Sequence, residues 1–281
     1  METTDRRQRD ELTIRALEKT ARRIRCDIVN MLTEANSGHP GGSLSAADIV
    51  TALYFWEMRV DPSRPDWEER DRFVLSKGHA VPVLYAALAE KGFIERDLLP
   101  SLRKLGSPLQ GHPDMRKCPG VEASTGSLGQ GIGWALGMAL GLQQDQRDAR
   151  VYVLLGDGEL QEGLVWEAVM AAAHYRLDNL VAFVDCNGLQ IDGPTEKVLS
   201  PNPIGPKFVA FNWHTIVIDG HDMLQITAAL DEARRTKGRP TAIIARTTKG
   251  KGVSFMEDQA DWHGKAPSKE QRDQAMTELT K

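Results

Sequence analysis

Two residues that could bind a metal ion and a diphosphate follow short apolar runs of this 281-residue chain. Asp157 lies between two glycines directly after Val151–Leu155, and Asn187 comes shortly after Leu180–Val184. An aspartate and an asparagine, with a main-chain carbonyl, suit a hard cation such as Mg²⁺, which completes its octahedron with phosphate oxygens and water. The glycines would let backbone N–H groups approach a diphosphate near the next helix. A Gly-Asp-Gly tripeptide alone is usually a turn, so this prediction depends on the pair.

Asp157 and Asn187 can meet only if the chain between them crosses over the sheet. Both apolar runs are typical of strands covered on both faces, and Gly163–Tyr175 between them has a helical pattern. A strand–helix–strand unit implies parallel neighbours and a right-handed crossover, so both strands end at the same edge of the sheet. Ligands bind at that edge in a doubly wound sheet.

The same alternation of helix and strand continues along the chain. Apolar residues at helical spacing predict a helix in the first 35 residues, and glycines and a proline predict its end near Ser37–Gly42. We predict further helices at Ser45–Met58, Val81–Lys91, Leu224–Thr236 and Ser268–Leu279 and after a loop at Gly111–Gly133, and further strands at Phe73–Leu75, Trp213–Ile218 and Thr241–Ala245. The expected fold is a single α/β domain over residues 1–281, with a doubly wound, mostly parallel sheet and helices on both faces.

Composition excludes several classes of function. With 35 basic and 39 acidic residues the net charge is −4, so no broad basic surface is available for nucleic acid or anionic lipid. No apolar run approaches the roughly 18–20 residues of a membrane span, and the charged first eleven residues do not resemble a signal peptide. Three widely spaced cysteines (Cys26, Cys118 and Cys186) predict a reduced, cytoplasmic protein without a disulfide framework.

Three other motifs are incomplete. The pair Gly129 and Gly131 lacks the third glycine of a dinucleotide fingerprint. Ser127 has a threonine where a serine-hydrolase elbow requires glycine, and the segment around Lys249 lacks the Walker A spacing. Three histidines lie outside any motif and are expected to be structural, with a role left open for the last: His174, His214 and His221.

The segment from Gly156 to Asn187 resembles the thiamin-diphosphate motif, and its surroundings resemble the transketolase family. The resemblance runs in register over nearly the whole chain. It is carried by Ser37–Ser45 (SGHPGGSLS), Asp71–His79 (DRFVLSKGH), Ser124–Gly131 (STGSLGQG), Gly156–Gly163 (GDGELQEG), Leu177–Leu180 (LDNL), Thr248–Gly252 (TKGKG) and Trp262–Lys265 (WHGK).

The resemblance implies a role for each matching position. Asp157 and Asn187 match side-chain metal ligands, and Leu189 matches a residue that offers its main-chain oxygen. Glu162 matches a carboxylate at the subunit interface. The positions matching cofactor contacts are His79, Gly126, Ser127, Leu128, Asp157, Gly158, Asn187, Lys249 and His263, and the positions matching substrate-channel histidines are His39, His79, His112 and His263.

These histidines suit the chemistry that the resemblance implies. Transketolases move a two-carbon ketol unit from a ketose phosphate to an aldose, with thiamin diphosphate as nucleophile and electron sink. Breaking and making the C–C bond requires moving a proton off and onto a hydroxyl, which suits imidazole. We expect His39 and His263 to move that proton and His112 to bind donor hydroxyls, with His79 near cofactor and donor.

Complete transketolase-like chains also contain a module that binds the aminopyrimidine and supplies an activating glutamate. This sequence ends at Lys281, soon after its last matching segment, so we expect that module to be absent. The hypothesis is an N-terminal subunit of a split transketolase that forms a heterotetramer with a C-terminal, pyrimidine-binding subunit. Two alternatives stay open: a subunit of a 2-oxo-acid decarboxylating thiamin enzyme, and a non-catalytic cofactor-binding subunit. The sugar donor and acceptor are also open, because the deciding residues would lie on the partner.

Overall fold

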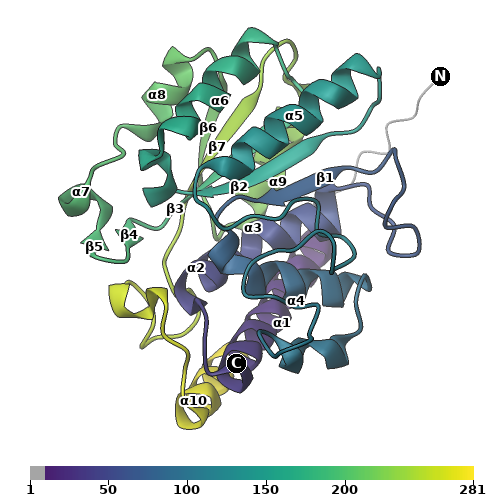
Figure 1. Ribbon diagram of the computed structural model, residues 1–281. Coiled ribbons are helices and arrows are strands. Elements are labelled where there is room, and N and C mark those ends of the chain that lie inside the picture. Colours follow the sequence, from purple (N-terminus) through teal and green to yellow (C-terminus); the bar gives the residue numbers. More distant parts are fainter. Residues whose placement is uncertain (1–9) are drawn as a thin grey trace.

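The computed structural model describes residues 10–281, and its centre is a five-stranded sheet (Figure 1). The strand order is β1-β2-β3-β7-β6, and every neighbouring pair in this sheet is parallel. The strands are β1 (Arg72–Leu75), β2 (Val151–Gly156), β3 (Leu180–Cys186), β6 (His214–Asp219) and β7 (Thr241–Arg246). The charged segment at residues 1–9, in which no signal peptide is expected, lies outside the described residues.

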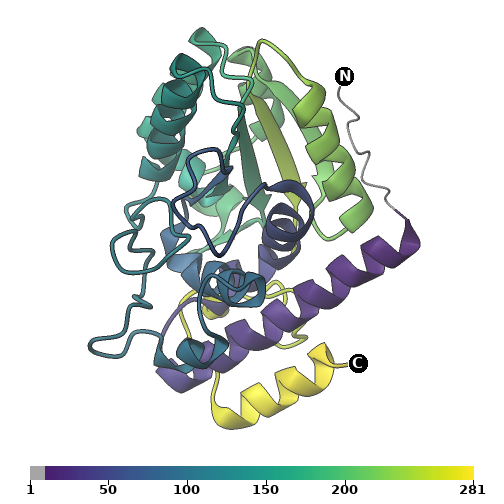
Figure 2. The ribbon, with the colours of Figure 1, turned by 90° about the vertical axis from the view of Figure 1, so that its right-hand side faces the viewer.

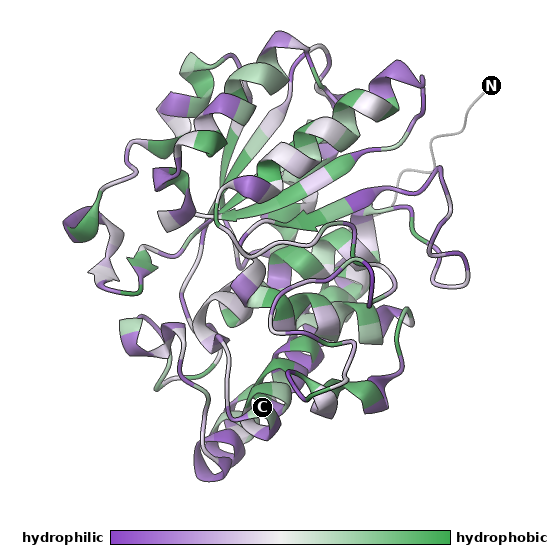
Figure 3. Cartoon of the chain, viewed as in Figure 1, coloured by the Kyte–Doolittle hydropathy of each residue, from purple (hydrophilic) through white to green (hydrophobic). Residues whose placement is uncertain are grey.

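Helices cover both faces of the sheet, as predicted (Figures 1 and 2). On one face lie α1 (Glu11–Ala35), α3 (Ala47–Ala52), α4 (Val81–Lys91) and α9 (Met223–Arg235), and on the other α5 (Gln130–Gln144), α6 (Gly163–His174) and α8 (Ile204–Ala210). Successive strand residues alternate between two cores: Tyr152 and Leu154 belong to the first, and Val151 and Val153 to the second. Because both faces of the central strands are buried, their sequences are nearly continuous apolar runs, which Figure 3 shows in green.

The remaining elements are short or peripheral. They are α2 (Pro40–Ser45), the π-helix η1 (Leu53–Glu57), the 3₁₀-helices η2 (Gly78–Ala80), η3 (Arg96–Ser101), η4 (Gly158–Gln161) and η5 (Ala260–His263), the β4 (Leu189–Gln190) and β5 (Gly193–Pro194) hairpin, α7 (Thr195–Val198) and α10 (Lys269–Leu279). The last helix begins with a capping box between Ser268 and Gln271 and packs along α1 (Figure 2). No helix within residues 10–281 is long and apolar enough to cross a membrane.

Two predicted boundaries are wrong. Helix α2 already begins at Pro40, because proline is tolerated in the first turn of a helix. The glycine that follows permits close packing: a Cβ on Gly41 would lie 2.9 Å from both Lys249 Cγ and the Trp262 carbonyl oxygen. The glycine-rich loop ends at Gly129 rather than Gly133, since α5 begins at Gln130.

The register of the sheet determines where chemistry can occur. Gly156 at the end of β2 pairs with Asp185 in β3, so the chain leaves both strands at one edge. Asp157 and Asn187 follow at that edge, where the crossover unit predicts them.

Candidate active site

A cavity of about 320 Å³ opens at the carboxyl edge of the sheet. Segments far apart in sequence contribute to it: the start of α2, the turn after β1, the loop before α5, the turns after β2 and β3, and the segment from β7 to η5. Most of the predicted site residues line it: His39, His79, Gly126, Leu128, Asp157, Gly158, Glu162, Asn187, Leu189, Lys249 and His263.

Two predicted residues lie beside the cavity rather than in its lining. His112 is exposed and packs against the backbone at Gly126, where an added Cβ would lie 3.1 Å from His112 Cδ2. Ser127 is also exposed, and its hydroxyl accepts a 3.4 Å hydrogen bond from the Gln130 side chain. Both therefore lie next to Gly126 and Leu128 of the lining, on the outer side.

The loops after β2 and β3 meet at the Asp157 carboxylate. Its two oxygens accept hydrogen bonds from the amides of Gly158 (2.8 Å) and Gly188 (2.7 Å). The side chain is only 4% exposed, and burial, aided by the nearby Asp185 carboxylate, raises the pKa of Asp157 to about 6. Within residues 10–281 no lysine, arginine or histidine makes an ion pair with it. A buried carboxylate in this position is suited to a bound cation.

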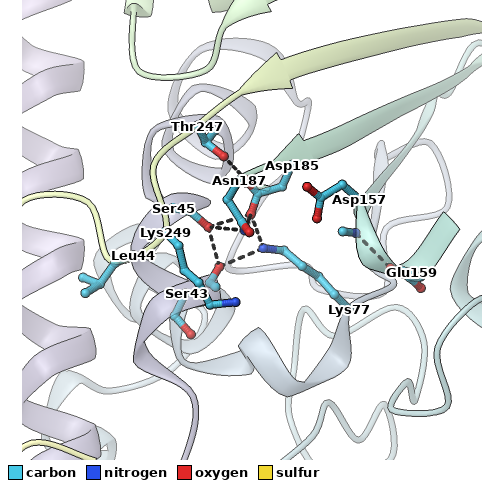
Figure 4. Close-up of polar contacts among 12 residues, drawn as sticks. Ser43, Leu44, Ser45, Lys77, Asp157, Glu159, Asp185, Asn187, Thr247 and Lys249 are labelled. Atoms are coloured by element: carbon cyan, nitrogen blue, oxygen red, sulfur yellow. Dashed lines mark hydrogen bonds and ion pairs between the residues drawn. The ribbon is translucent and has the colours of Figure 1, made fainter. Parts of the chain in front are cut away.

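Asp185 binds several polar side chains close to the loops after β2 and β3 (Figure 4). It is fully buried at the end of β3 and forms an ion pair with Lys77. It also accepts hydrogen bonds from the hydroxyls of Ser45 (2.6 Å) and Thr247 and from the Asn187 amide (3.3 Å). Although burial opposes ionisation, Lys77 and these donors hold the pKa of Asp185 below its ordinary value. Because the nitrogen of Asn187 faces Asp185, its Oδ1 is left as the acceptor, and it takes a 3.2 Å hydrogen bond from the Leu189 amide.

A third buried carboxylate, Glu159, lies in the lining of the cavity. Glu159 accepts hydrogen bonds from the amides of Gly129 (2.8 Å) and Gly156 (3.0 Å) and from the hydroxyl of Ser76. It thereby joins the turn after β2 to the start of α5, next to the cavity. Burial raises the pKa of Glu159, and the three donors oppose that shift.

Three histidines form a compact triangle on the remaining side. The ring centroids of His39 and His79 are 5.1 Å apart, those of His79 and His263 are 5.1 Å apart, and those of His39 and His263 are 5.6 Å apart. Burial is the largest cause that lowers each pKa, to about 4 for His39, to about 3 for His263 and well below the ordinary value for His79. The three rings are therefore neutral near pH 7 and can accept a proton.

Lys249 connects this triangle to the segment after β3. Its Nζ lies 3.0 Å from Nδ1 of His263 and donates a 3.1 Å hydrogen bond to the Leu189 carbonyl. Burial, followed by the charge of Lys77, lowers the pKa of Lys249 to about 8. Nδ1 of His39 is buried without a hydrogen-bond partner among residues 10–281.

Sequence reasoning missed Lys77, Asp185 and Glu159 as site residues. Each had a signal in the sequence. Lys77 and Glu159 lie within the matching segments Asp71–His79 and Gly156–Gly163, and Asp185 is a charge that follows directly on an apolar strand. A charged residue in a buried strand requires a partner, and only the tertiary structure identifies that partner as Lys77.

The donor set fits a magnesium diphosphate. Within the described part of the chain, no group of three or more His, Cys, Asp or Glu side chains is arranged to hold a metal by itself. One carboxylate (Asp157), one amide oxygen (Asn187) and one carbonyl (Leu189) would instead leave positions for phosphate oxygens and water around a hard cation such as Mg²⁺. Leu128 and Ile191, 37% and 70% exposed, add apolar surface at the rim for a ring system.

A parallel α/β domain with these residues at its carboxyl edge defines a thiamin-diphosphate-binding domain. Residues 16–280 match the family described as "Transketolase, thiamine diphosphate binding domain". The chain belongs to the transketolase family, whose activity is ketol transfer, so the predicted fold class and family are confirmed.

Relatives of two lengths match the chain. It is 45% identical over 265 residues to the 6-deoxy-6-sulfo-D-fructose transketolase subunit SqwG of Clostridium sp., covering 94% of this chain and 96% of the relative. It is 43% identical over 269 residues to one of the subunits of the apulose-4-phosphate transketolase of Phocaeicola vulgatus, covering 96% of this chain and 95% of the relative. Human transketolase is 45% identical over 271 residues, but the match covers 96% of this chain and only 43% of the human protein.

Solved structures agree with the fold. Transketolase from Leishmania mexicana superposes with a TM-score of 0.90 at 34% identity, over 94% of this chain and 41% of that chain. Transketolase from Campylobacter jejuni also has a TM-score of 0.90 at 34% identity, over 95% of this chain and 43% of that chain.

Proposed function

We propose that this chain is the N-terminal subunit of a split transketolase, active with a separate C-terminal, pyrimidine-binding subunit. The observation that carries the proposal is how much of each relative the chain matches. It spans nearly all of two relatives named as transketolase subunits but less than half of human transketolase. On this proposal residues 1–281 are one cofactor-binding domain, and the assembly is a heterotetramer. The three free cysteines favour the cytoplasm as its compartment.

Mg²⁺ and the diphosphate would be held at the corner between β2 and β3. Asp157 and Asn187 would supply side-chain oxygens, and Leu189 would supply its main-chain oxygen, which has a second lone pair beside the one that accepts from Lys249. The other cofactor contacts proposed are His79, Gly126, Ser127, Leu128, Gly158, Lys249 and His263. When bound, thiamin diphosphate supplies the nucleophilic carbon and an electron sink.

Proton transfer to and from the sugar is proposed for His39 and His263. Both rings line the cavity, and burial keeps them neutral near pH 7, so each has a ring nitrogen that can accept a hydrogen bond from a sugar hydroxyl. His79 would complete the wall against cofactor and donor. His112, which packs outside Gly126, would bind the donor's hydroxyls from the rim.

The partner subunit is proposed to cover an exposed apolar face beside the cavity. Leu128 lies at its edge, and Trp134 (52% exposed), Leu164 and Met170 (59% exposed) extend it over α5 and α6. Scattered apolar side chains are common on surfaces, but these lie on two helices that pack together next to the cofactor cavity. Glu162 is exposed in the same region and lines the cavity, which suits a carboxylate that meets the partner.

The test is reconstitution. This chain, with thiamin diphosphate and Mg²⁺, should be inactive alone and should transfer ketol units once the C-terminal subunit is added. Normal turnover of ketose phosphates by the chain alone would contradict the split. Profiling ketose donors and aldose acceptors with the complex identifies the sugar phosphates, and decarboxylation of a 2-oxo acid instead of ketol transfer would place the complex in the other class of thiamin enzyme.

A further inference from the structure

His221 connects two segments that are far apart in the sequence. Its Nδ1 lies 2.7 Å from Oδ2 of Asp48 in α3, and its Nε2 lies 2.8 Å from the main-chain nitrogen of Thr248. Because a main-chain N–H can only donate, Nε2 must be the unprotonated acceptor and Nδ1 carries the hydrogen toward the carboxylate. The contacts therefore select a single neutral tautomer of His221.

Asp48 is held firmly enough to fix that imidazole. Arg25 of α1 binds both oxygens of Asp48, at 3.0 and 2.6 Å, and both side chains are buried. Arg25 also donates a 3.4 Å hydrogen bond to the Leu44 carbonyl in α2. Bidentate arginine–carboxylate pairs have a defined geometry, so the orientation of His221 is tied to the helices under the site.

Thr248 immediately precedes Lys249, whose ammonium contacts His263 and the Leu189 carbonyl. The residues around it are also anchored: Thr247 bonds to Asp185, and the Gly250 amide donates to the Gly41 carbonyl at 3.0 Å. Figure 4 shows Thr247 directed toward Asp185 and Lys249 extending toward the same group of polar side chains. The amide of Thr248 has His221 as its acceptor, and that hydrogen bond sets the peptide that carries Lys249.

We infer that His221 is a positioning residue for the reaction: by accepting the Thr248 N–H it holds Lys249 in contact with His263 and Leu189. The kinetic consequence rests on the proposed function, but the structural consequence does not. Loss of the acceptor leaves the Thr248 N–H unpaired, so the Thr248 peptide can rotate between its anchored neighbours and displace Lys249; a misplacement of about 1 Å in an active site costs up to about 10²-fold in rate.

The experiment compares three variants. His221→Ala removes the acceptor, and His221→Gln restores an amide oxygen near the position of Nε2. His214→Ala is the matched control, because His214 also lies about 2.7 Å from a carboxylate, Glu232, but at the opposite end of β6. On the chain alone, hydrogen exchange at the Thr248 amide should accelerate about tenfold in His221→Ala, and should stay near the wild-type rate in the other two. Side-chain ¹⁵N NMR of the wild type should show His221 with an unprotonated Nε2.

The reconstituted complex supplies the kinetic arm. There kcat should fall about 10- to 100-fold in His221→Ala, with little change in the KM for the ketose donor, and His221→Gln should recover most of it. Unchanged exchange at Thr248 in His221→Ala, a protonated Nε2, or an equal loss of kcat in His214→Ala would overturn the inference. Because exchange and tautomer are measured without the partner, an inactive complex would count against the proposed function and not against this role of His221.

Discussion

Replacing Asp157 by Asn should raise the stability of the ligand-free chain, relative to the wild type, as the pH rises, while removing its response to magnesium and cofactor. The reason is the cost of keeping a carboxylate charged in a buried site. The pKa of Asp157 rises from its ordinary 3.8 to about 6 in the folded chain, first because of burial. That rise corresponds to about 3 kcal/mol.

The sign follows from linkage. A carboxyl whose folded pKa lies above its unfolded value favours folding while it is protonated, below about pH 4, and that contribution is lost as the pH rises through about 6. At pH 8 the wild type therefore carries the full penalty of about 3 kcal/mol, and roughly half of it develops between pH 5 and pH 8. Asn removes this pH dependence but sets an NH₂ group against one of the two amide donors, Gly158 or Gly188, at a pH-independent cost of about 1–3 kcal/mol.

Urea unfolding of the wild type and Asp157→Asn at pH 5 and pH 8 measures this difference. The unfolding free energy of the variant relative to wild type should rise by about 1.5 kcal/mol over that interval. Asp145→Asn, an exposed substitution, should show no such rise. With Mg²⁺ and thiamin diphosphate at about 100 times the dissociation constant, the wild type should gain about 2.7 kcal/mol and Asp157→Asn nothing. A variant whose relative stability does not change with pH, or which keeps the ligand response, would refute the reasoning.

Three further predictions concern the histidines, the buried ion pair and the apolar face. The pKa values of His39 and His263 lie near 4 and 3, below the ordinary 6.5, so their contribution to stability is present above pH 6.5 and is lost as the pH falls toward 4. NMR should find both rings neutral at pH 5.5. Titration midpoints near 6.5 would contradict this. Lys77→Met should lower the unfolding free energy by about 3–5 kcal/mol, because it leaves Asp185 without its ion-pair partner. Adding Asp185→Asn should restore part of that free energy. An additive further loss in the double variant would argue against the Lys77–Asp185 ion pair. Trp134→Glu should weaken assembly with the C-terminal subunit in size-exclusion chromatography while leaving the unfolding free energy of the chain nearly unchanged, and an undiminished complex would exclude this face as the interface.

Local patterns predicted the elements well because most of them are buried in a regular way. The apolar runs that became β2 and β3 are covered on both faces, so nearly every position in them is apolar whichever segments cover them. The glycines after His39 were misread, because glycine can end a helix or let another segment approach closely. At Gly41 the glycine lets another segment approach closely, and only the position of Lys249, more than 200 residues away in the sequence, shows this.

The sequence by itself determined the kind of site: an aspartate and an asparagine at the ends of neighbouring parallel strands, and four histidines in segments that resemble one family. The crossover rule was enough to bring Asp157 and Asn187 to one edge, because parallel strands end together. The tertiary structure alone decided how those groups are charged and held. The pairing of Lys77 with Asp185, the triangle of neutral imidazoles and the link from Arg25 through Asp48 and His221 to Thr248 join positions that no local pattern relates. They arise because burial makes an unpaired charge or N–H costly, and the fold offers each buried group a partner from a distant segment.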